Sequence, residues 1–125
     1  MPPEPEELWT FLPLGYLLTV AIELPILAVG LSVRHSIKRR ITAGFWLTAC
    51  TYPIVVLVLP YLIWEPYGYA LYLTIAETFA PLAECLLFWL AYLAPATPRT
   101  RVDLRDFTAV VAANLASFLL GLVIL

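Results

Sequence analysis

The sequence has few charged residues and few groups suited to metal or redox chemistry. Only 13% of its 125 residues are charged, against about 25% in a typical soluble domain. It has one histidine, His35, and two cysteines, Cys50 and Cys85, without a CxxC spacing. We therefore expect His35 to be a loop residue rather than a metal ligand or proton relay. The cysteines are expected to be small packing residues rather than a disulfide.

The motifs of the common enzyme and cofactor classes are also missing. The sequence contains no nucleotide-binding loop, no HExxH, no Ser-His-Asp arrangement and no Glu-x-x-His pair. A single histidine excludes a bis-histidine haem within one chain. The net charge of −2 does not indicate a nucleic-acid partner. We accordingly predict no enzyme activity, no cofactor, no metal and no nucleic acid.

Hydrophobic residues, in contrast, make up 62% of the chain and form four long apolar stretches, residues 8–33, 41–63, 68–94 and 107–125. A helix needs about 20 residues to cross the hydrocarbon of a bilayer, and short connections make successive helices antiparallel neighbours. We predict one all-α membrane domain over residues 1–125, a bundle of four transmembrane helices. Residues 1–7 lack the basic region of a secretory signal, so we expect the first helix to be retained.

The positive charges of the sequence predict an orientation in the membrane. All seven Lys and Arg residues lie in the first and third connections, and the other side of the predicted bundle carries glutamates. The positive-inside rule places the loops 34–40 and 95–106 in the cytoplasm and both termini outside. Aromatic side chains gather at both ends of the spans, as interfacial belts do. We expect the inner (plasma) membrane of a bacterial-type cell.

The first basic loop has two interpretations. Its cations are Arg34, Lys38, Arg39 and Arg40. They could fix the topology alone, or they could bind anionic lipid headgroups or an acidic partner. The sequence leaves both interpretations open.

Three glutamates, Glu23, Glu77 and Glu84, lie inside predicted spans. An ionised carboxylate near the bilayer centre costs roughly 2.5–3.5 kcal/mol on insertion scales. No Lys or Arg lies within any of the four stretches to offset that cost. Each carboxyl must therefore be protonated, hydrogen-bonded, bound to a cation or paired with another subunit.

The depth of these groups predicts a polar layer. Counting about 1.5 Å per residue from the middle of each span places Glu23, Glu84 and Asn114 at one level. Thr48 and Thr51 lie near the same level. Glu77 lies two turns away from Glu84, on the same face of the same helix. The layer could line a proton or cation path. Such groups also hydrogen-bond across helices simply to hold them together, and the sequence leaves that alternative open.

Prolines fall in the middle of three spans, at Pro25, Pro53 and Pro81. Each removes one helical hydrogen bond and frees the carbonyl four residues earlier, so we expect kinked helices. These carbonyls belong to Ala21, Ala49 and Glu77. We expect them to add oxygen ligands to the polar layer.

Small residues repeat at every fourth position of the last span. They are Ala109, Ala113, Ser117 and Gly121. A ridge of this kind lets helix backbones approach closely. It predicts a packing surface, either for a helix of the same chain or for a partner.

Together these features favour a small transport or permeation protein, working as a homo-oligomer, that moves protons, cations or small solutes. The alternative is a non-catalytic accessory or assembly subunit of a larger membrane complex, in which the glutamates only pack helices or pair with a partner. A membrane enzyme acting on lipid is the weakest hypothesis, because only a glutamate could serve as acid or base.

Overall fold

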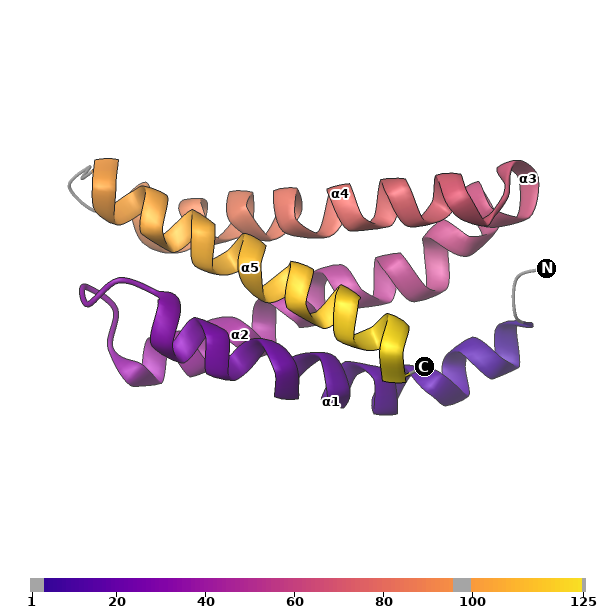
Figure 1. Ribbon diagram of the computed structural model, residues 1–125, viewed down its shortest axis with the longest axis horizontal. Helices are drawn as coiled ribbons and strands as arrows, with labels where there is room; N and C mark the ends of the chain where they lie inside the picture. The colour runs from indigo at the N-terminus through magenta and orange to yellow at the C-terminus, as the bar shows by residue number, and fades with distance from the viewer. Residues whose placement is uncertain (1–3, 96–99, 125) are drawn as a thin grey trace.

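The computed structural model describes residues 4–95 and 100–124, and within these ranges the regular structure is helical throughout (Figure 1). The segments are α1 (Pro5–Gly30), α2 (Ile37–Pro53), η1 (Ile54–Val58), η2 (Pro60–Trp64), α3 (Glu65–Tyr67), α4 (Tyr69–Phe88), η3 (Trp89–Leu93) and α5 (Thr100–Ile124). The η segments are π-helical turns. Segments α2 to α3 form one long helix, and α4 continues into η3.

Four helices are long and apolar enough to cross a membrane, over residues 6–30, 37–67, 69–93 and 101–122. The predicted all-α bundle with four candidate spans is therefore confirmed. The boundaries of two helices differ from the predicted ones, because the second helix runs from Ile37 to Tyr67 instead of from 41 to 63, and the fourth begins at Thr100 instead of at 107. The second begins early because Ser36 caps it, accepting a hydrogen bond of 3.1 Å from the Arg39 backbone N–H.

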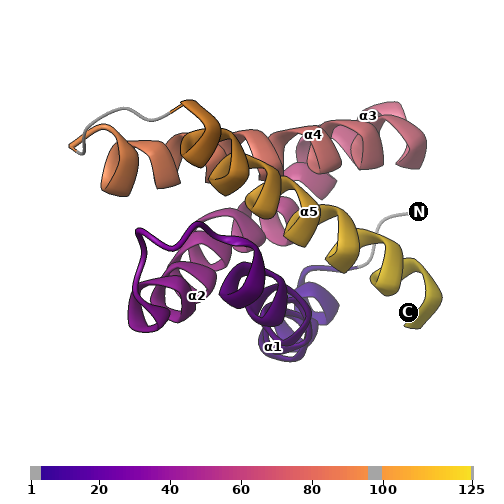
Figure 2. The same ribbon diagram turned by 60° about the vertical axis from the view of Figure 1, so that its left-hand side comes forward.

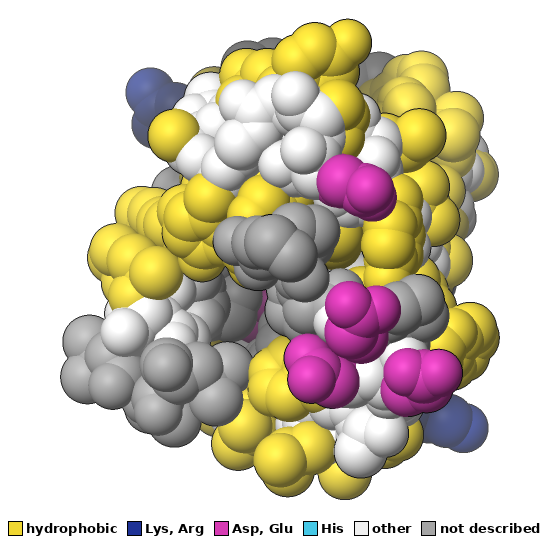
Figure 3. Space-filling view, turned by 90° about the vertical axis from the view of Figure 1, so that its right-hand side faces the viewer, with side chains coloured by type: hydrophobic (Ala, Val, Ile, Leu, Met, Phe, Trp, Pro, Cys, Tyr) yellow, Lys and Arg dark blue, Asp and Glu magenta, His cyan; other side chains and the backbone are white. Residues whose placement is uncertain are grey.

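The two ends of the bundle differ in charge. Both termini and α3 lie at one end, on the right in Figure 1. We call it the acidic end because its exposed charges are Glu4, Glu6, Glu7 and Glu65 (Figure 3). The opposite end, which we call the basic end, carries the first connection and the adjoining ends of α2 and α5, where all Lys and Arg residues of the described part of the chain lie.

Polar and apolar side chains are distributed inside out relative to a soluble protein. Val29 and Val33 are 77% and 92% exposed, whereas Glu23 and Asp106 are 2% and 0% exposed. Large apolar side chains cover the outside of all four long helices. An apolar exterior around a polar interior fits hydrocarbon as the surrounding solvent.

The second long helix widens into π-helical turns after Pro53. In a π-turn the N–H of residue i+5 bonds the carbonyl of residue i, and the Leu59 N–H bonds Ile54 O in this way. The next donor would be residue 60, which is a proline and has no N–H. Tyr72 of α4 supplies the missing donor, since its hydroxyl donates to Val55 O at 2.9 Å. The predicted proline effect thus takes the form of π-turns, which the sequence did not indicate.

Helix α5 crosses the bundle obliquely and packs on both α1 and α4 (Figures 1 and 2). At the basic end the crossing is close, because a Cβ built on Gly30 would lie 3.1 Å from the Cβ of Ala109. The predicted small-residue ridge thus meets a helix of the same chain at Ala109. At Gly121 the ridge has open space, since a Cβ there would meet no atom within 4 Å.

Replacing Gly30 by leucine should lower the midpoint of thermal unfolding in detergent, because the added side chain must push α1 away from Ala109. Overpacking of this kind costs about 1–3 kcal/mol. The matched control is Gly121→Leu, which places the same side chain in open space. Equal midpoints for the two variants would show that the α1–α5 crossing does not depend on its small residues.

Candidate functional site: a carboxyl layer between the four helices

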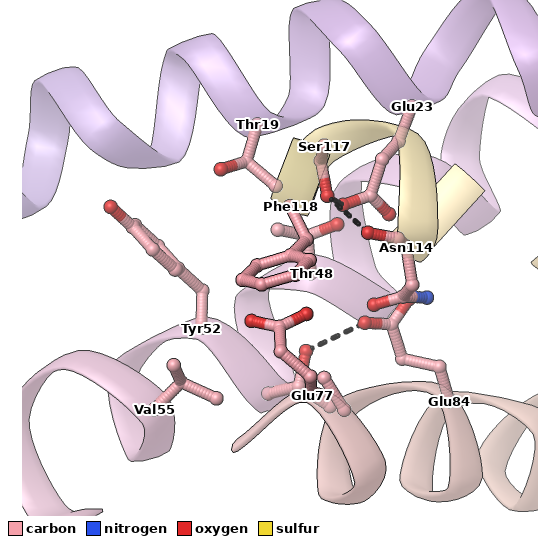
Figure 4. Close-up of a pocket in the computed structure, with 12 residues that line it drawn as sticks. Thr19, Glu23, Thr48, Tyr52, Val55, Glu77, Glu84, Asn114, Ser117 and Phe118 are labelled. Atoms are coloured by element: carbon pink, nitrogen blue, oxygen red, sulfur yellow. Dashed lines mark hydrogen bonds between the residues drawn. The ribbon is translucent and has the colours of Figure 1, made fainter. Parts of the chain in front are cut away.

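A cavity of about 140 Å³ lies between the four long helices (Figure 4). All six residues predicted for a proton or cation path line it, namely Glu23, Glu77, Glu84, Asn114, Thr48 and Thr51. We call this set, together with Ser117, the carboxyl layer. Each long helix contributes at least one of its side chains. The structure therefore brings together groups that lie up to 94 residues apart in sequence.

Helical spacing explains why these side chains converge. Residues three and four apart lie on the same face of a helix. On α5, Asn114 and Ser117 are three apart, and on α2, Thr48 and Thr51 are three apart. The inward face of each helix therefore delivers its polar groups to the same cavity.

Two carboxyls of the layer are hydrogen-bonded to hydroxyl groups of neighbouring helices. The Thr51 hydroxyl lies 2.8 Å from Glu84 Oε2, and the Ser117 hydroxyl lies 2.9 Å from Glu23 Oε2. The same hydroxyls also lie within reach of backbone carbonyls, 3.2 Å from Leu47 O and 2.9 Å from Asn114 O. Each hydroxyl thus faces two acceptor oxygens.

This arrangement has a consequence for protons. A hydroxyl carries one proton and can donate to only one acceptor at a time. When the carboxyl carries a proton of its own, the carboxylic acid donates to the hydroxyl and the hydroxyl donates to the carbonyl. Each hydroxyl–carboxyl pair can therefore take up or release one proton by reorienting its hydroxyl, while the heavy atoms stay in place.

Two fully buried oxygen atoms of the layer have no hydrogen-bond partner. They are Glu23 Oε1 and Thr48 Oγ1, and each side chain belongs to a residue that is 2% exposed. Asn114 offers little to them, because its amide donates to Val110 O at 3.0 Å and lies beside Glu84 (Figure 4). The cavity therefore presents free acceptors to anything that enters it.

The layer is not a ready-made metal centre. Among the described residues, no group of three His, Cys, Asp or Glu side chains is close enough to hold a metal ion. The polar groups of the site are instead separate carboxyls and hydroxyls, which suit a proton or a singly charged cation.

Some sequence expectations for the layer differ from the structure. Of the three carbonyls that proline frees, only that of Glu77 belongs to a residue lining the cavity; Ala21 and Ala49 are exposed. Tyr52 and Phe118, which line the cavity, were not predicted. Aromatic residues are so frequent in membrane spans that periodicity alone gave no signal for these two.

Four apolar side chains close the cavity toward the basic end. They form what we call the apolar seal, Leu27, Leu47, Phe88 and Val110. Each lies four residues from a member of the carboxyl layer on the same helix, so it occupies the same face one turn away. None is more than 1% exposed, and all belong to one buried cluster. The polar interior is therefore interrupted by a dry layer.

A second buried polar cluster lies beyond the seal, around Asp106. This carboxyl accepts hydrogen bonds from the Ser32 backbone N–H at 2.7 Å and from the Ser32 hydroxyl at 3.1 Å. His35 Nε2 lies 2.9 Å from the same carboxyl, and both of these side chains are fully buried. His35 is a loop residue, as predicted, but it packs inside the protein, with its ring 5.2 Å from that of Phe88.

This cluster was not predicted, because Asp106 falls within the predicted connection 95–106. Because α5 begins at Thr100, Asp106 is a helical residue and not part of a loop. It precedes Val110 by four residues and Asn114 by eight, so it lies on the inward face. The four-residue spacing was a signal that could have revealed Asp106, had the helix been extended backward.

Several arginines of the basic end act within the chain. Arg40 donates to Ala28 O at 2.6 Å and to Ser32 O at 3.1 Å, and Arg105 donates to Gly30 O at 3.0 Å. These contacts satisfy carbonyls at and just beyond the C-terminus of α1, where cations are favourable. Lys38 is exposed and remains available to a headgroup or partner.

Comparison of the chain with models of known protein families, with curated proteins and with solved structures finds no match. Function therefore has to be argued from the geometry of the carboxyl layer.

Replacing Asp106 by alanine should destabilise the protein strongly, because Ser32 and His35 lose a buried acceptor. Removing one partner of a buried ionic or hydrogen-bonded cluster costs about 3–5 kcal/mol. Thermal unfolding in detergent measures the effect, with Glu65→Ala at the exposed acidic end as the control. If both variants unfold at the wild-type temperature, the cluster does not hold the basic end together.

Proposed function

We propose that this protein is a small membrane protein that passes protons, or small cations in their place, through its carboxyl layer. The observation that carries the proposal is the pairing of Glu23 and Glu84 with hydroxyls that each face a second acceptor. Such pairs exchange a proton by turning a hydroxyl, which suits a relay. A purely structural cluster would gain nothing from the unpartnered atoms Glu23 Oε1 and Thr48 Oγ1.

The charge distribution supports an orientation of the protein in the membrane. We propose that the acidic end faces outward and the basic loops face the cytoplasm, in a bacterial-type inner membrane. Exposed glutamates at the acidic end (Figure 3) raise the local concentration of protons and cations there. The apolar seal lies between the carboxyl layer and the basic end, so conduction requires the seal to open or hydrate. A bundle of 125 residues is small for a transporter, and we propose that it works as a homo-oligomer.

The test is proton flux into proteoliposomes that contain a pH-sensitive dye and are energised by a potassium diffusion potential. Wild-type protein should acidify the vesicles, and Glu84→Gln should reduce the rate by about tenfold or more, equivalent to about 1.4 kcal/mol or more in barrier height. Glutamine keeps the size of the side chain but cannot release a proton.

Glu65→Gln is the matched control, because this exposed residue lies outside the cavity and three other glutamates remain at the acidic end, so the rate should change far less than in Glu84→Gln. Glu23→Gln provides an independent second variant. Flux that is the same in wild type, Glu84→Gln and Glu23→Gln would contradict the proposal.

A second candidate function is that of an accessory subunit of a larger membrane complex. The observation in its favour is the outward face of α5, where Leu115, Leu119 and Leu122 are each more than half exposed. A partner helix could approach closely there. Purification in a mild detergent, followed by native mass spectrometry, distinguishes the two functions. Stoichiometric foreign subunits would favour the accessory role, whereas a homo-oligomer without them would favour transport.

A further inference from the structure

Two more cavities continue the inner cavity toward the acidic end. The middle cavity, of about 200 Å³, shares Tyr52 and Ser117 with the inner one. The outer cavity, of about 380 Å³, shares Phe11 and Tyr72 with the middle one and reaches the exposed Glu7. Because neighbouring cavities share lining residues, the three form a row from the acidic end to the carboxyl layer, and we call this row the passage. The volumes fall in the range of ligand sites, roughly 300–1,000 Å³ in total.

The walls of the passage change in character along its length. Its outer and middle parts are lined by aromatic side chains, among them Phe11, Trp64 and Tyr72, with the last two stacked at 5.2 Å between ring centroids. Ring faces attract positive charge. Carboxyls lie at both ends, and no Lys or Arg occurs among the described residues that line the three cavities. The passage therefore suits a cation with an apolar body.

The inner end supplies acceptors for the head of such a cation. Glu23 Oε1 and Thr48 Oγ1 are buried without partners and belong to side chains that line the cavity (Figure 4). An ammonium group carries three donors and no acceptor, so it can donate to Glu23 Oε1 and to the Thr48 hydroxyl oxygen at the same time. A neutral apolar molecule would leave both oxygens unsatisfied, and an anion would meet carboxyls at either end.

We propose that the passage binds an organic monocation, a primary ammonium on an apolar body. The ammonium group lies at Glu23 and Thr48, and the body lies among Tyr52, Phe11 and Tyr72. This inference rests on the proposed function in one respect, because the proton that binding releases comes from the same carboxyl layer.

Binding exchanges one positive charge for another. Before binding, the Glu23 carboxylic acid donates to Ser117. As the ammonium arrives, this carboxyl releases its proton to solvent, and the resulting carboxylate pairs with the ammonium while the Ser117 hydroxyl turns to donate to it. The net charge of the cavity stays the same, which a poorly solvated interior favours.

Tyr52 lies where the inner and middle cavities meet, with Gly15 behind it. A Cβ added at Gly15 would overlap the Tyr52 hydroxyl and come within 2.6 Å of Phe11 Cε1. Both rings line the passage, so Gly15→Ala forces a ring to move while every carboxyl is retained. This substitution is therefore a steric probe of the passage.

The test is isothermal titration of the detergent-solubilised full chain with phenethylammonium, and with 2-phenylethanol as a neutral molecule of similar shape. Phenethylammonium should bind at least about tenfold more tightly than the alcohol and release about one proton for each molecule bound. Proton release is obtained from the binding heats in buffers of different ionisation enthalpy. Equal binding of the two molecules would overturn the proposal.

Two variants locate the site. Glu23→Gln should weaken phenethylammonium binding by about tenfold or more and abolish proton release, and Gly15→Ala should weaken binding by a similar factor. Glu65→Gln, outside the passage, should bind as wild type does. Binding that neither Glu23→Gln nor Gly15→Ala weakens would overturn the proposed site.

The outcome also separates this site from the proposed function. Proton flux in vesicles without ammonium binding would overturn the site and leave proton permeation intact. Ammonium binding with proton release, but without any flux, would support the site and contradict permeation.

Discussion

Hydrocarbon offers no hydrogen bonds, so every polar group that the four helices turn inward needs a partner within the protein. The chain meets this constraint differently at two levels. Around Asp106 it is met in full, since Ser32 and His35 supply the donors. In the carboxyl layer it is met only in part, because Glu23 Oε1 and Thr48 Oγ1 stay unpartnered. A satisfied cluster holds helices together, and an unsatisfied one can receive a ligand. This difference distinguishes the Asp106 cluster from the carboxyl layer.

The arginines of the basic end illustrate how one residue serves two physical needs. Their positive charge predicts the orientation of the chain in a membrane. In the structure, Arg40 and Arg105 also satisfy carbonyls at the end of α1, and Arg34 pairs with Asp103 at 2.9 Å. The α1 end is therefore tied to α2 and α5 by the same side chains on which the predicted topology rests. Headgroup binding, one of the interpretations open from the sequence, stays a prediction for Lys38 and Arg39, which are both exposed.

The sequence predicted those features that depend on periodicity and hydropathy. Four apolar stretches identified the long helices, and equal depth placed Glu23, Glu84 and Asn114 at one cavity. The sequence did not predict features that depend on where a helix begins or ends. Asp106 was assigned to a connection because charge resembles a loop signal, although its helix begins at Thr100. The aromatic residues that line the passage were also not predicted, because the pattern of a hydrophobic sequence does not distinguish an inward-facing tyrosine from an outward-facing one.

In the second long helix, the number of residues in the π-helical turns determines the direction in which the following side chains point, as well as the length of the helix. A π-turn holds about one residue more than the α-turn it replaces, and each residue turns the helix by about 100°. Trp64 follows η1 and is the last residue of η2, so its stacking on Tyr72 depends on those extra residues. Loss of one residue in this segment would barely shorten the helix but would swing Trp64 away from the passage. Insertions and deletions here are therefore constrained by angular register, even though the surrounding lipid would tolerate the change in length.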